Sequence, residues 1–481
     1  YEPVTAFWLA DVERVGGIAN LSTLINEVRL HEPISLLLDA GDIFTGSLSK
    51  ATLGKLAFDI YSAMGYDAVN LGNHEFEYGS DALRNAMQRA RFPVLSANIF
   101  YSGTDVTLAQ SYTIREVAGV RVGIIGAMGI DAFINTMMAS NRAGLEVRSL
   151  KDMIQPLVDQ IRDEVDMVVI LTHQNATAPM QTDKEADPEV QRGYLEDYEL
   201  AGQLKGVDMI IGGHSDHGLW QPVVHPDTGT YIGMTFGQGK HLGYAKFDVA
   251  RGKPAKLLAA ELIVVDSDRY PANPKIKALI DAARAEHPWL AETVSSLDKQ
   301  AVRKYYAEST LGNLLADMLR DATGADVGFV PSGAIRADLE AGDVSVEQVL
   351  NVFPFTDTVS VVSLPGNILR QVIEKSLALD YGIVQLSGVE LSFDKTRPAG
   401  HRLLEVNIGA APLDSDETYT LVTGSFTATG GENYSMFAGL PVKQSNKLVS
   451  EVFVEYFRKT GQVKLPDLGR QFDLERNGLS E

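Results

Sequence analysis

The stretch Ala-Val-Asn-Leu-Gly-Asn-His-Glu at residues 68–75 is the strongest sign of the fold of this chain. Its first four residues read as a buried β-strand. The glycine that follows ends the strand, so that Asn73, His74 and Glu75 fall in the next loop. In α/β folds, ligands bind beyond the carboxyl ends of strands. The stretch therefore predicts a strand that delivers polar side chains to a site.

Other predicted strands of the first half end in the same way. Buried runs at residues 34–39, 120–126, 167–172 and 207–212 alternate with helical patterns. The pieces that bring Asp, Asn or His to strand ends are Leu9-Ala10-Asp11, Gly41-Asp42, Gly72-Asn73-His74-Glu75, Thr172-His173 and Gly212-Gly213-His214-Ser215-Asp216-His217. Each piece alone is more typical of a turn or a helix cap. Together they favour one shared site.

This mixture of oxygen and nitrogen ligands suits borderline divalent metals such as Zn, Mn, Co or Fe. Two such ions about 4 Å apart share a bridging carboxylate, hold a phosphoryl group and generate a hydroxide near neutral pH. The first half is therefore predicted to hold a centre with two divalent metal ions.

The second half has a different organisation. Residues 266–274 break the pattern with Asp, Ser, Pro and Asn, and the helical stretch that follows, residues 275–297, is interpreted as a linker helix. Beyond it we predict helices near 310–323 and 366–379 and strands at 327–330, 359–364 and 418–423. The expected division is a first domain at 1–268, a linker at 269–302 and a second α/β domain at 303–481.

The composition narrows the possible partners. The 481 residues have a net charge of −21 and a pI near 4.9, which argues against a nucleic-acid polymer as partner. An anionic substrate is still compatible, because bound metal ions invert the local sign. With no cysteine, disulfides and thiolate chemistry are excluded. No apolar run reaches the roughly 20 residues of a membrane span. Residues 1–8 lack a signal-peptide pattern, so we expect that a signal was removed or never existed.

The order Asp, Gly-Asp-x-x-x-Gly, Gly-Asn-His-Glu, His, Gly-Gly-His resembles the calcineurin-like metallophosphoesterases. In the second half, Glu308-Ser309-Thr310-Leu311-Gly312-Asn313, Ser332-Gly333-Ala334-Ile335-Arg336, Phe353-Pro354-Phe355 and residues 426–432 resemble the C-terminal domain of the secreted 5′-nucleotidases. The resemblance covers nearly the whole chain. It implies a four-layer α/β/β/α sandwich with a second α/β substrate-binding domain. It also implies a periplasmic or secreted phosphoric monoester hydrolase that releases phosphate from nucleotides.

The resemblance further implies which residues hold the metals. Asp42 would bridge the two ions. Asp216 stands where many relatives have His or Gln as the last ligand, and His217 is its rival. The six implied ligands are Asp11, Asp42, Asn73, His173, His214 and Asp216.

Catalytic and substrate-binding roles follow from the same resemblance. His74 resembles the catalytic His, and Glu77 would be its orienting acid. Phe355 and Phe426 match two aromatic residues that sandwich the nucleobase, although burial in the core is the default for phenylalanine. Stacking is worth on the order of 1–3 kcal/mol per contact. Glu432 stands where the family often has an Asp that bonds the ribose.

The first motif departs from the family pattern. Asp11 is followed by Val12 and Glu13, whereas the family reads Asp-x-His and uses that His as a metal ligand. Relatives also have a longer stretch before the Gly-Gly pair that matches residues 16–17. Either a loop that carries the His is missing from this sequence, which we favour, or the loop is deleted. In the second case Glu13 must substitute, or the first metal binds weakly.

The phosphate end of the substrate site departs as well. A family Arg is Ala307 here and a family Asn is Pro331, while Arg336 remains as a bidentate anchor for phosphate. Two other functions stay open. One is a nucleotide-binding protein with a degenerate metal centre, and the other is a dimetal hydrolase of a non-nucleotide substrate.

Overall fold

The structure is a computed structural model that describes residues 1–5, 12–175, 192–379 and 381–474. It divides into two compact units, Tyr1–Glu286 and His287–Glu481. Each unit has its own sheets and its own core, and each is described separately below. Asp11, one of the predicted metal ligands, lies outside the described residues.

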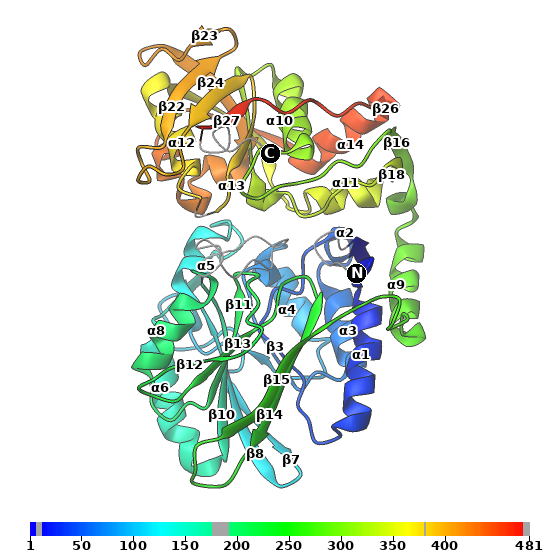
Figure 1. Cartoon of the computed structure of the whole chain (residues 1–481), viewed down its shortest axis with the longest axis vertical. Coiled ribbons are helices and arrows are strands. Elements are labelled where there is room, and N and C mark those ends of the chain that lie inside the picture. The colour runs from blue at the N-terminus through cyan, green and yellow to red at the C-terminus, as the bar shows by residue number, and fades with distance from the viewer. Residues whose placement is uncertain (6–11, 176–191, 380, 475–481) are drawn as a thin grey trace. The chain divides into compact units, whose positions relative to one another are not determined.

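A six-stranded sheet forms the centre of the first unit (Figure 1). Its order is β12 (Val223–Val224), β13 (Tyr231–Met234), β11 (Met209–His214), β10 (Met167–Gln174), β8 (Val120–Met128) and β7 (Tyr112–Val117). The inner strands are parallel, and the edge strands β7 and β12 are antiparallel to their neighbours. The predicted strands at 120–126, 167–172 and 207–212 are confirmed. Their carboxyl ends meet at one edge, as parallel strands require.

Helices cover one face of this sheet and a second β layer covers the other. On the helical face, α6 (Leu150–Ile161) and α8 (Leu195–Gln203) bury Ile154 and Leu200 against strand residues such as Ile170. Opposite, the parallel strands β3 (Leu38–Asp39), β4 (Ala68–Asn70) and β5 (Val94–Leu95) pack with the hairpin of β14 (His241–Asp248) and β15 (Lys256–Val264).

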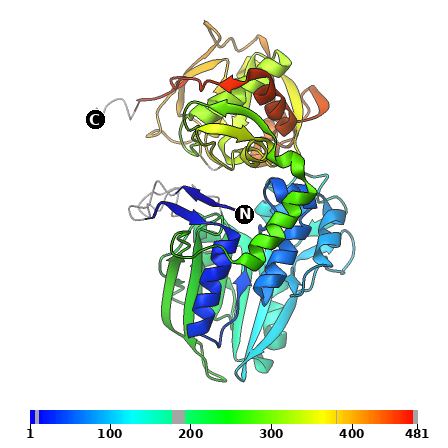
Figure 2. The ribbon, with the colours of Figure 1, turned by 90° about the vertical axis from the view of Figure 1, so that its right-hand side faces the viewer.

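A further helical layer completes the sandwich on the outside of the second β layer. Helices α1 (Ile18–His31), α3 (Lys55–Met64) and α9 (Pro274–Glu286) contact one another there, and Figure 2 shows α1 and α9 side by side. The predicted α/β/β/α sandwich is therefore confirmed. The remaining elements used below are η1 (His74–Phe76), α2 (Ser47–Thr52), α4 (Ser80–Met87) and α5 (Ile130–Asn135).

Two predicted elements are wrong in part. The strand expected at residues 34–39 begins only at Leu38, where pairing with Ala68 starts, and Ile34 is 64% exposed. The helix expected over residues 275–297 ends at Glu286. Pro288 disfavours helical backbone at the residue before it, so a short 3₁₀ turn and β16 (Thr293–Leu297) follow instead. The proposed linker at 269–302 stays a prediction.

The second unit is built on a five-stranded mixed sheet. Its order is β20 (Val384–Ser387), β17 (Val327–Pro331), β24 (Thr418–Gly424), β19 (Thr358–Pro365) and β25 (Val442–Leu448). Two smaller sheets flank it, β18 (Gly342–Ser345) with β16 and β26 (Gln462–Val463), and β23 (Ala411–Pro412) with β22 (Leu403–Ile408), β21 (Val389–Phe393) and β27 (Gln471–Asp473). The principal helices are α10 (Thr310–Thr323), α11 (Val346–Val352), α12 (Gly366–Ser376), α13 (Ser425–Ala428) and α14 (Val449–Thr460). The predicted strands and α10 are confirmed, and the helix predicted to residue 379 ends at Ser376.

The motif that begins at Glu308 is held by local hydrogen bonds. Ser309 caps α10 by accepting the Gly312 N–H at 3.0 Å, which satisfies one of the free donors of the first turn. The buried carboxylate of Glu308 accepts the backbone N–H groups of Gly469 and Arg470. Glu308 therefore anchors the C-terminal segment to the start of α10, a structural role that the sequence motif did not reveal.

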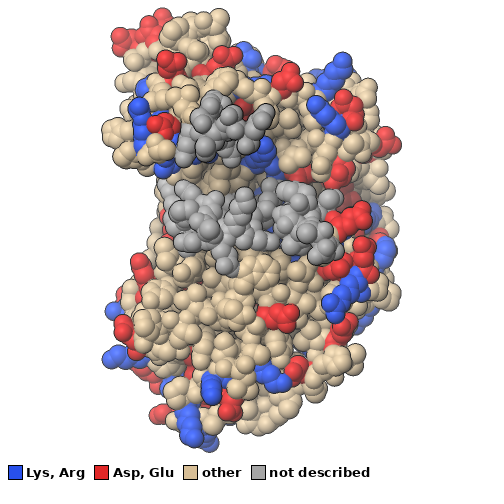
Figure 3. Space-filling model, in the orientation of Figure 1, with Lys and Arg blue, Asp and Glu red and all other residues tan. Residues whose placement is uncertain are grey.

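The surface agrees with the acidic composition. On the face in Figure 3, Lys and Arg side chains are interspersed with Asp and Glu and form no broad basic patch among the described residues. Among these same residues, no helix has the length and apolar character that crossing a membrane requires.

Candidate metal centre

Asp42 lies in a tight turn after β3 that brings its carboxylate against the loop after β4. The backbone of Asp42 is left-handed (φ 69°), and His74 donates its N–H to Asp42 Oδ1 at 2.8 Å. Gly72 leaves room for this approach, since a Cβ there would lie 2.3 Å from the same oxygen. This close approach explains the glycine that opens the Gly-Asn-His-Glu stretch.

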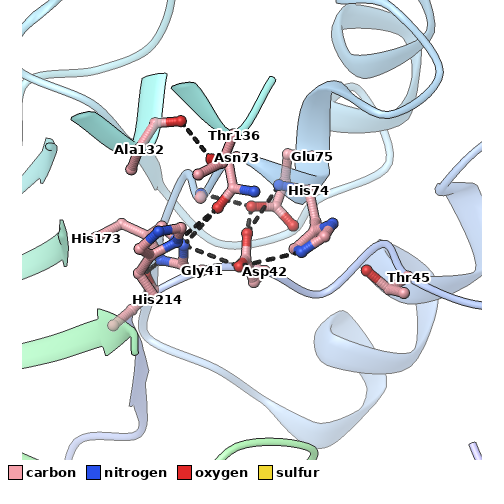
Figure 4. A network of polar contacts seen from close by, with 12 residues as sticks. Gly41, Asp42, Thr45, Asn73, His74, Glu75, Ala132, Thr136, His173 and His214 are labelled. Atoms are coloured by element: carbon pink, nitrogen blue, oxygen red, sulfur yellow. Dashed lines mark hydrogen bonds and ion pairs between the residues drawn. The ribbon is translucent and has the colours of Figure 1, made fainter. Parts of the chain in front are cut away.

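Glu75 fastens the two loops together (Figure 4). Its carboxylate, in a side chain that is 1% exposed, accepts the N–H groups of Asp42 at 2.9 Å, Ile43 at 2.6 Å and Gly72 at 2.5 Å. Burial, reinforced by Asp42, raises the pKa of Glu75 to about 7. Sequence reasoning quoted this residue within its motif but gave it no role. A buried acid three residues after a loop glycine was the available signal.

Three of the predicted ligands converge on Asp42, as Figure 4 shows. His173 Nε2 lies 2.9 Å from Asp42 Oδ2 and 3.1 Å from Asn73 Oδ1. His214 Nδ1 lies 2.9 Å from the same amide oxygen. The ligand atoms of Asp42, His173 and His214 all lie within 4.8 Å of one another. The structure thus brings together four residues that the sequence placed on four different loops.

The strand register explains why the two histidines meet. In the parallel pair β10 and β11, His173 stands opposite Gly213 and the next residue stands opposite His214. Gly213 also makes space, because a Cβ there would lie 2.9 Å from His173 Nδ1. Both imidazoles therefore extend from adjacent strand ends toward the Asp42 turn.

The electrostatics of the cluster favour a positive charge beside Asp42. Burial alone would keep His173 neutral, but the Asp42 carboxylate outweighs burial and raises the pKa of His173 to about 9. Burial would likewise raise the pKa of Asp42, yet His173 and His74 hold it well below its usual range. In the metal-free protein, a proton on His173 therefore occupies the electrostatic place of a cation.

The donor set fits a divalent metal ion. With its proton on Nδ1, His173 donates to the Ala40 carbonyl at 2.8 Å, which directs Nε2 at Asp42 and Asn73 as a ligand. One carboxylate, one amide oxygen and two imidazoles are a mixture that borderline divalent metals accept. The coarse prediction of divalent metal ions is supported by this arrangement.

The geometry separates the two candidates for the last ligand. Asp216 lines the same cavity of about 990 Å³ as Asp42 and His214. The ring of His217 instead stacks on Tyr194 at 5.9 Å, and burial lowers the pKa of His217 to about 4. Asp216 is therefore better placed for a metal than His217, and its assignment as a ligand stays a prediction.

His74 lies next to the cluster without joining its ligand atoms. Its Nδ1 contacts Glu77 Oε1, and its Nε2 lies 3.8 Å from Asp42 Oδ2. Thr45 donates to the same Glu77 oxygen at 3.2 Å, and the Glu77 side chain is largely buried. This arrangement fixes the orientation of the imidazole, as the proposed orienting role of Glu77 requires.

The predicted substrate residues of the second unit also gather. The Arg336 guanidinium lies 5.4 Å from the centre of the Phe355 ring. Asp357 accepts the Phe426 N–H at 2.6 Å, which ties the segment after Phe355 to the start of α13. Phe355 and Phe426 are only partly buried, in contrast to the neighbouring core residue Phe353. Neither ring therefore behaves as an ordinary core phenylalanine.

Glu432 completes this group. Its backbone is left-handed (φ 53°), and its Oε2 is buried with no hydrogen-bond partner among the residues that the structure describes. Burial raises the pKa of Glu432 to about 7, although Arg336 opposes the rise. Arg303 lies near the same segment and donates to the Ile335 carbonyl at 3.3 Å. A polar ligand that bonds Glu432 would satisfy the buried oxygen.

Comparison with known proteins agrees with both halves of this description. The model of the calcineurin-like phosphoesterases matches residues 7–217, and that of the 5′-nucleotidase C-terminal domain matches residues 289–439. The chain is 29% identical to the trifunctional nucleotide phosphoesterase protein YfkN of Bacillus subtilis (strain 168) over 93% of its own length, but spans only 33% of that protein. It is 26% identical to the 5′-nucleotidase of Bos taurus, with 90% of this chain and 81% of that protein covered.

A solved structure extends the likeness to the whole fold. The 5′-nucleotidase precursor from Thermus thermophilus superposes with a TM-score of 0.83 and 27% identity, over 98% of this chain and 96% of that one. The layered fold and the ligands at its strand ends define a metallophosphoesterase of the calcineurin-like type. With its second unit, the chain belongs to the 5′-nucleotidase family of phosphoric monoester hydrolases.

Proposed function

We propose that this protein hydrolyses the phosphate monoester of nucleotides with the aid of two divalent metal ions. The observation that carries the proposal is the cluster in which His173 and His214 both face the amide oxygen of Asn73. A carboxylate and two imidazoles aimed at one point are the ligands of a hydrolytic metal centre. Bound divalent ions supply Lewis acidity and neutralise charge on the phosphoryl oxygens.

The residues of the first unit have distinct proposed roles. Asp42, with one oxygen toward His173 and the other fixed by the His74 N–H, is the bridging ligand. The six ligands are Asp11, Asp42, Asn73, His173, His214 and Asp216. The His74 side chain, oriented by Glu77, stabilises charge on the phosphoryl group or the leaving oxygen.

The second unit is proposed to bind the nucleotide. Phe355 and Phe426 stack on the base, and their partial exposure supports this role. Arg336 anchors the phosphate, and Glu432 bonds the ribose hydroxyls through the buried oxygen. Because Ala307 and Pro331 replace family anchors for phosphate, a longer phosphate chain is expected to compensate for weaker contacts at that end.

A phosphate-release assay tests the proposal. Metal-free protein is loaded with Mn, Zn, Co or Mg and given mono-, di- and triphosphates, a dinucleotide and a base-free phosphate ester. Nucleotides should be hydrolysed faster, in kcat/KM, than the base-free ester. Phe355→Ala and Phe426→Ala should each remove on the order of 1–3 kcal/mol of that preference. Phe472→Ala, at a 44% exposed site on β27, is the control.

The outcomes separate the alternatives. Nucleotide binding without hydrolysis under any metal would indicate a degenerate centre. Equal turnover of the base-free ester, unchanged by either Phe substitution, would indicate a non-nucleotide substrate. A periplasmic or secreted location is also proposed, and the description of the Thermus thermophilus relative as a precursor supports it. Fractionation of the source cells with an antibody to this chain would test the location.

A further inference from the structure

A buried carboxylate on α8 lies behind the candidate metal ligands. Asp197 is 0% exposed. Its Oδ1 accepts Gln174 Nε2–H at 2.7 Å, and its Oδ2 accepts Asn175 Nδ2–H at 2.7 Å. The Asp197 N–H in turn donates to Asn175 Oδ1 at 3.0 Å. Three hydrogen bonds thus attach the start of α8 to the end of β10 and the residue after it.

These bonds act where the ligands are carried. Gln174 follows His173 directly and stands opposite His214 in the β10–β11 register. Asn175 has a left-handed backbone (φ 85°), a conformation that persists where neighbouring contacts determine it. The position of Asp197 therefore decides how the chain leaves β10 just after His173.

Asp197 also lies against β11. A Cβ on Gly212 would fall 2.2 Å from Asp197 Oδ2, so the absence of a side chain at Gly212 admits the carboxylate. Gly212 is two residues before His214. One side chain thus contacts the ends of both strands that deliver the histidines, without touching either imidazole.

The polarity of the bonds requires a carboxylate. Both partner groups are amide NH₂ donors, and only a carboxylate accepts one bond on each oxygen. An asparagine would accept one bond and turn its own NH₂ toward the other donor. A buried group with an unmet partner costs about 1–3 kcal/mol, enough to displace one of the strand ends.

We infer that Asp197 is a positioning residue for the metal centre. It fixes the ends of β10 and β11 so that His173 Nε2 and His214 Nδ1 both face Asn73. The inference rests on the proposed function for its catalytic meaning, but the positioning itself can be measured in the metal-free protein.

The decisive variant pair is Asp197→Asn and the double variant Asp197→Asn with Gln174→Glu. The double variant reverses the polarity of one bond, because the new amide donates to the new carboxylate, and it keeps the net charge. Gln174→Glu alone completes the double-mutant cycle. Glu199→Gln, at an exposed site on the same helix, makes the same change of charge without touching the strands.

Two readouts are compared for each variant. The first is the ¹⁵N and ¹H signals of the His173 and His214 side chains in metal-free, histidine-labelled protein. The second is the affinity for Co²⁺ and the visible spectrum of the Co²⁺ form. Asp197→Asn should move both histidine signals, change the Co²⁺ spectrum and weaken Co²⁺ binding by about 10- to 100-fold. The double variant should recover most of each change, and Glu199→Gln should match the wild type.

Wild-type histidine signals and Co²⁺ affinity in Asp197→Asn would overturn the inference, as would a double variant no better than Asp197→Asn. If Asp197→Asn does not fold, Gln174→Met removes a single bond and must still move the His173 signal. A wild type that hydrolyses no phosphate would refute the proposed function. The histidine signals of the metal-free variants would then still test the positioning role of Asp197 independently.

Discussion

Replacing Asp42 by asparagine should change the protonation of His173 in the metal-free protein. The two side chains lie 2.9 Å apart, and the His173 side chain is fully buried. Burial by itself favours the neutral imidazole, and the Asp42 carboxylate is the principal group that reverses this preference. Asparagine keeps the shape of the side chain but removes the charge. We therefore expect the pKa of His173 to fall from about 9 to below 6.5.

The magnitude follows from linkage. A rise from 6.5 to about 9 corresponds to about 3 kcal/mol of differential interaction with the charged imidazole. Because the pKa in the folded protein is the higher one, this stabilisation is complete below pH 6.5 and is lost as the pH rises to about 9. Metal-free wild type should lose about 3 kcal/mol of unfolding free energy over that window relative to Asp42→Asn.

Two measurements check this expectation. An NMR titration of histidine-labelled, metal-free protein gives the pKa of His173, and urea unfolding of the first unit at pH 6, 7.5 and 9 gives the free energies. Asp105→Asn, at a side chain that is 96% exposed, is the control for loss of a carboxylate. A His173 pKa that stays near 9 in Asp42→Asn, or parallel pH profiles for variant and wild type, would refute the reasoning.

Three further substitutions test separate parts of the structure. His74→Ala should lower kcat by roughly 100-fold or more with metal content unchanged, and loss of metal measured by elemental analysis would make His74 a ligand instead. Glu75→Gln removes one acceptor from three backbone N–H groups, so titration calorimetry should show Co²⁺ binding at least about tenfold weaker, with the exposed Glu116→Gln unaffected. Glu308→Gln should lower the urea unfolding free energy of the second unit by about 1–3 kcal/mol while kcat and KM stay unchanged, and an altered KM would contradict its structural role.

The sequence predicted the strand ends well because hydrophobic runs and loop residues are local signals. The runs that became β8, β10 and β11 are continuous and apolar, and each is followed by a polar or glycine residue. Parallel pairing then forces their carboxyl ends to one edge, so the meeting of His173 and His214 follows from topology. The strand at 34–37 failed because apolar letters alone do not supply a pairing partner.

The supporting contacts could not be predicted, because they depend on positions far apart in the chain. Glu75 binds the N–H of Asp42, 33 residues earlier, and Asp197 binds residues more than 20 positions before it. Neither pairing leaves a periodic pattern. Their signal is indirect, a charged residue in a segment that must be buried, and it does not name the partner.

The second unit shows which end of a substrate this chain is built to hold. The aromatic side is intact, with Phe355 stacked near Arg336 and Phe426 tied through its N–H to Asp357. The phosphate side has lost charge, since Ala307 carries none and its carbonyl instead accepts a hydrogen bond from Gln385 at 2.9 Å. Base stacking gains little from metal, whereas the phosphoryl group gains much. A chain that keeps the first and weakens the second therefore leaves recognition to the base and places the phosphate mainly in the charge of the metal centre.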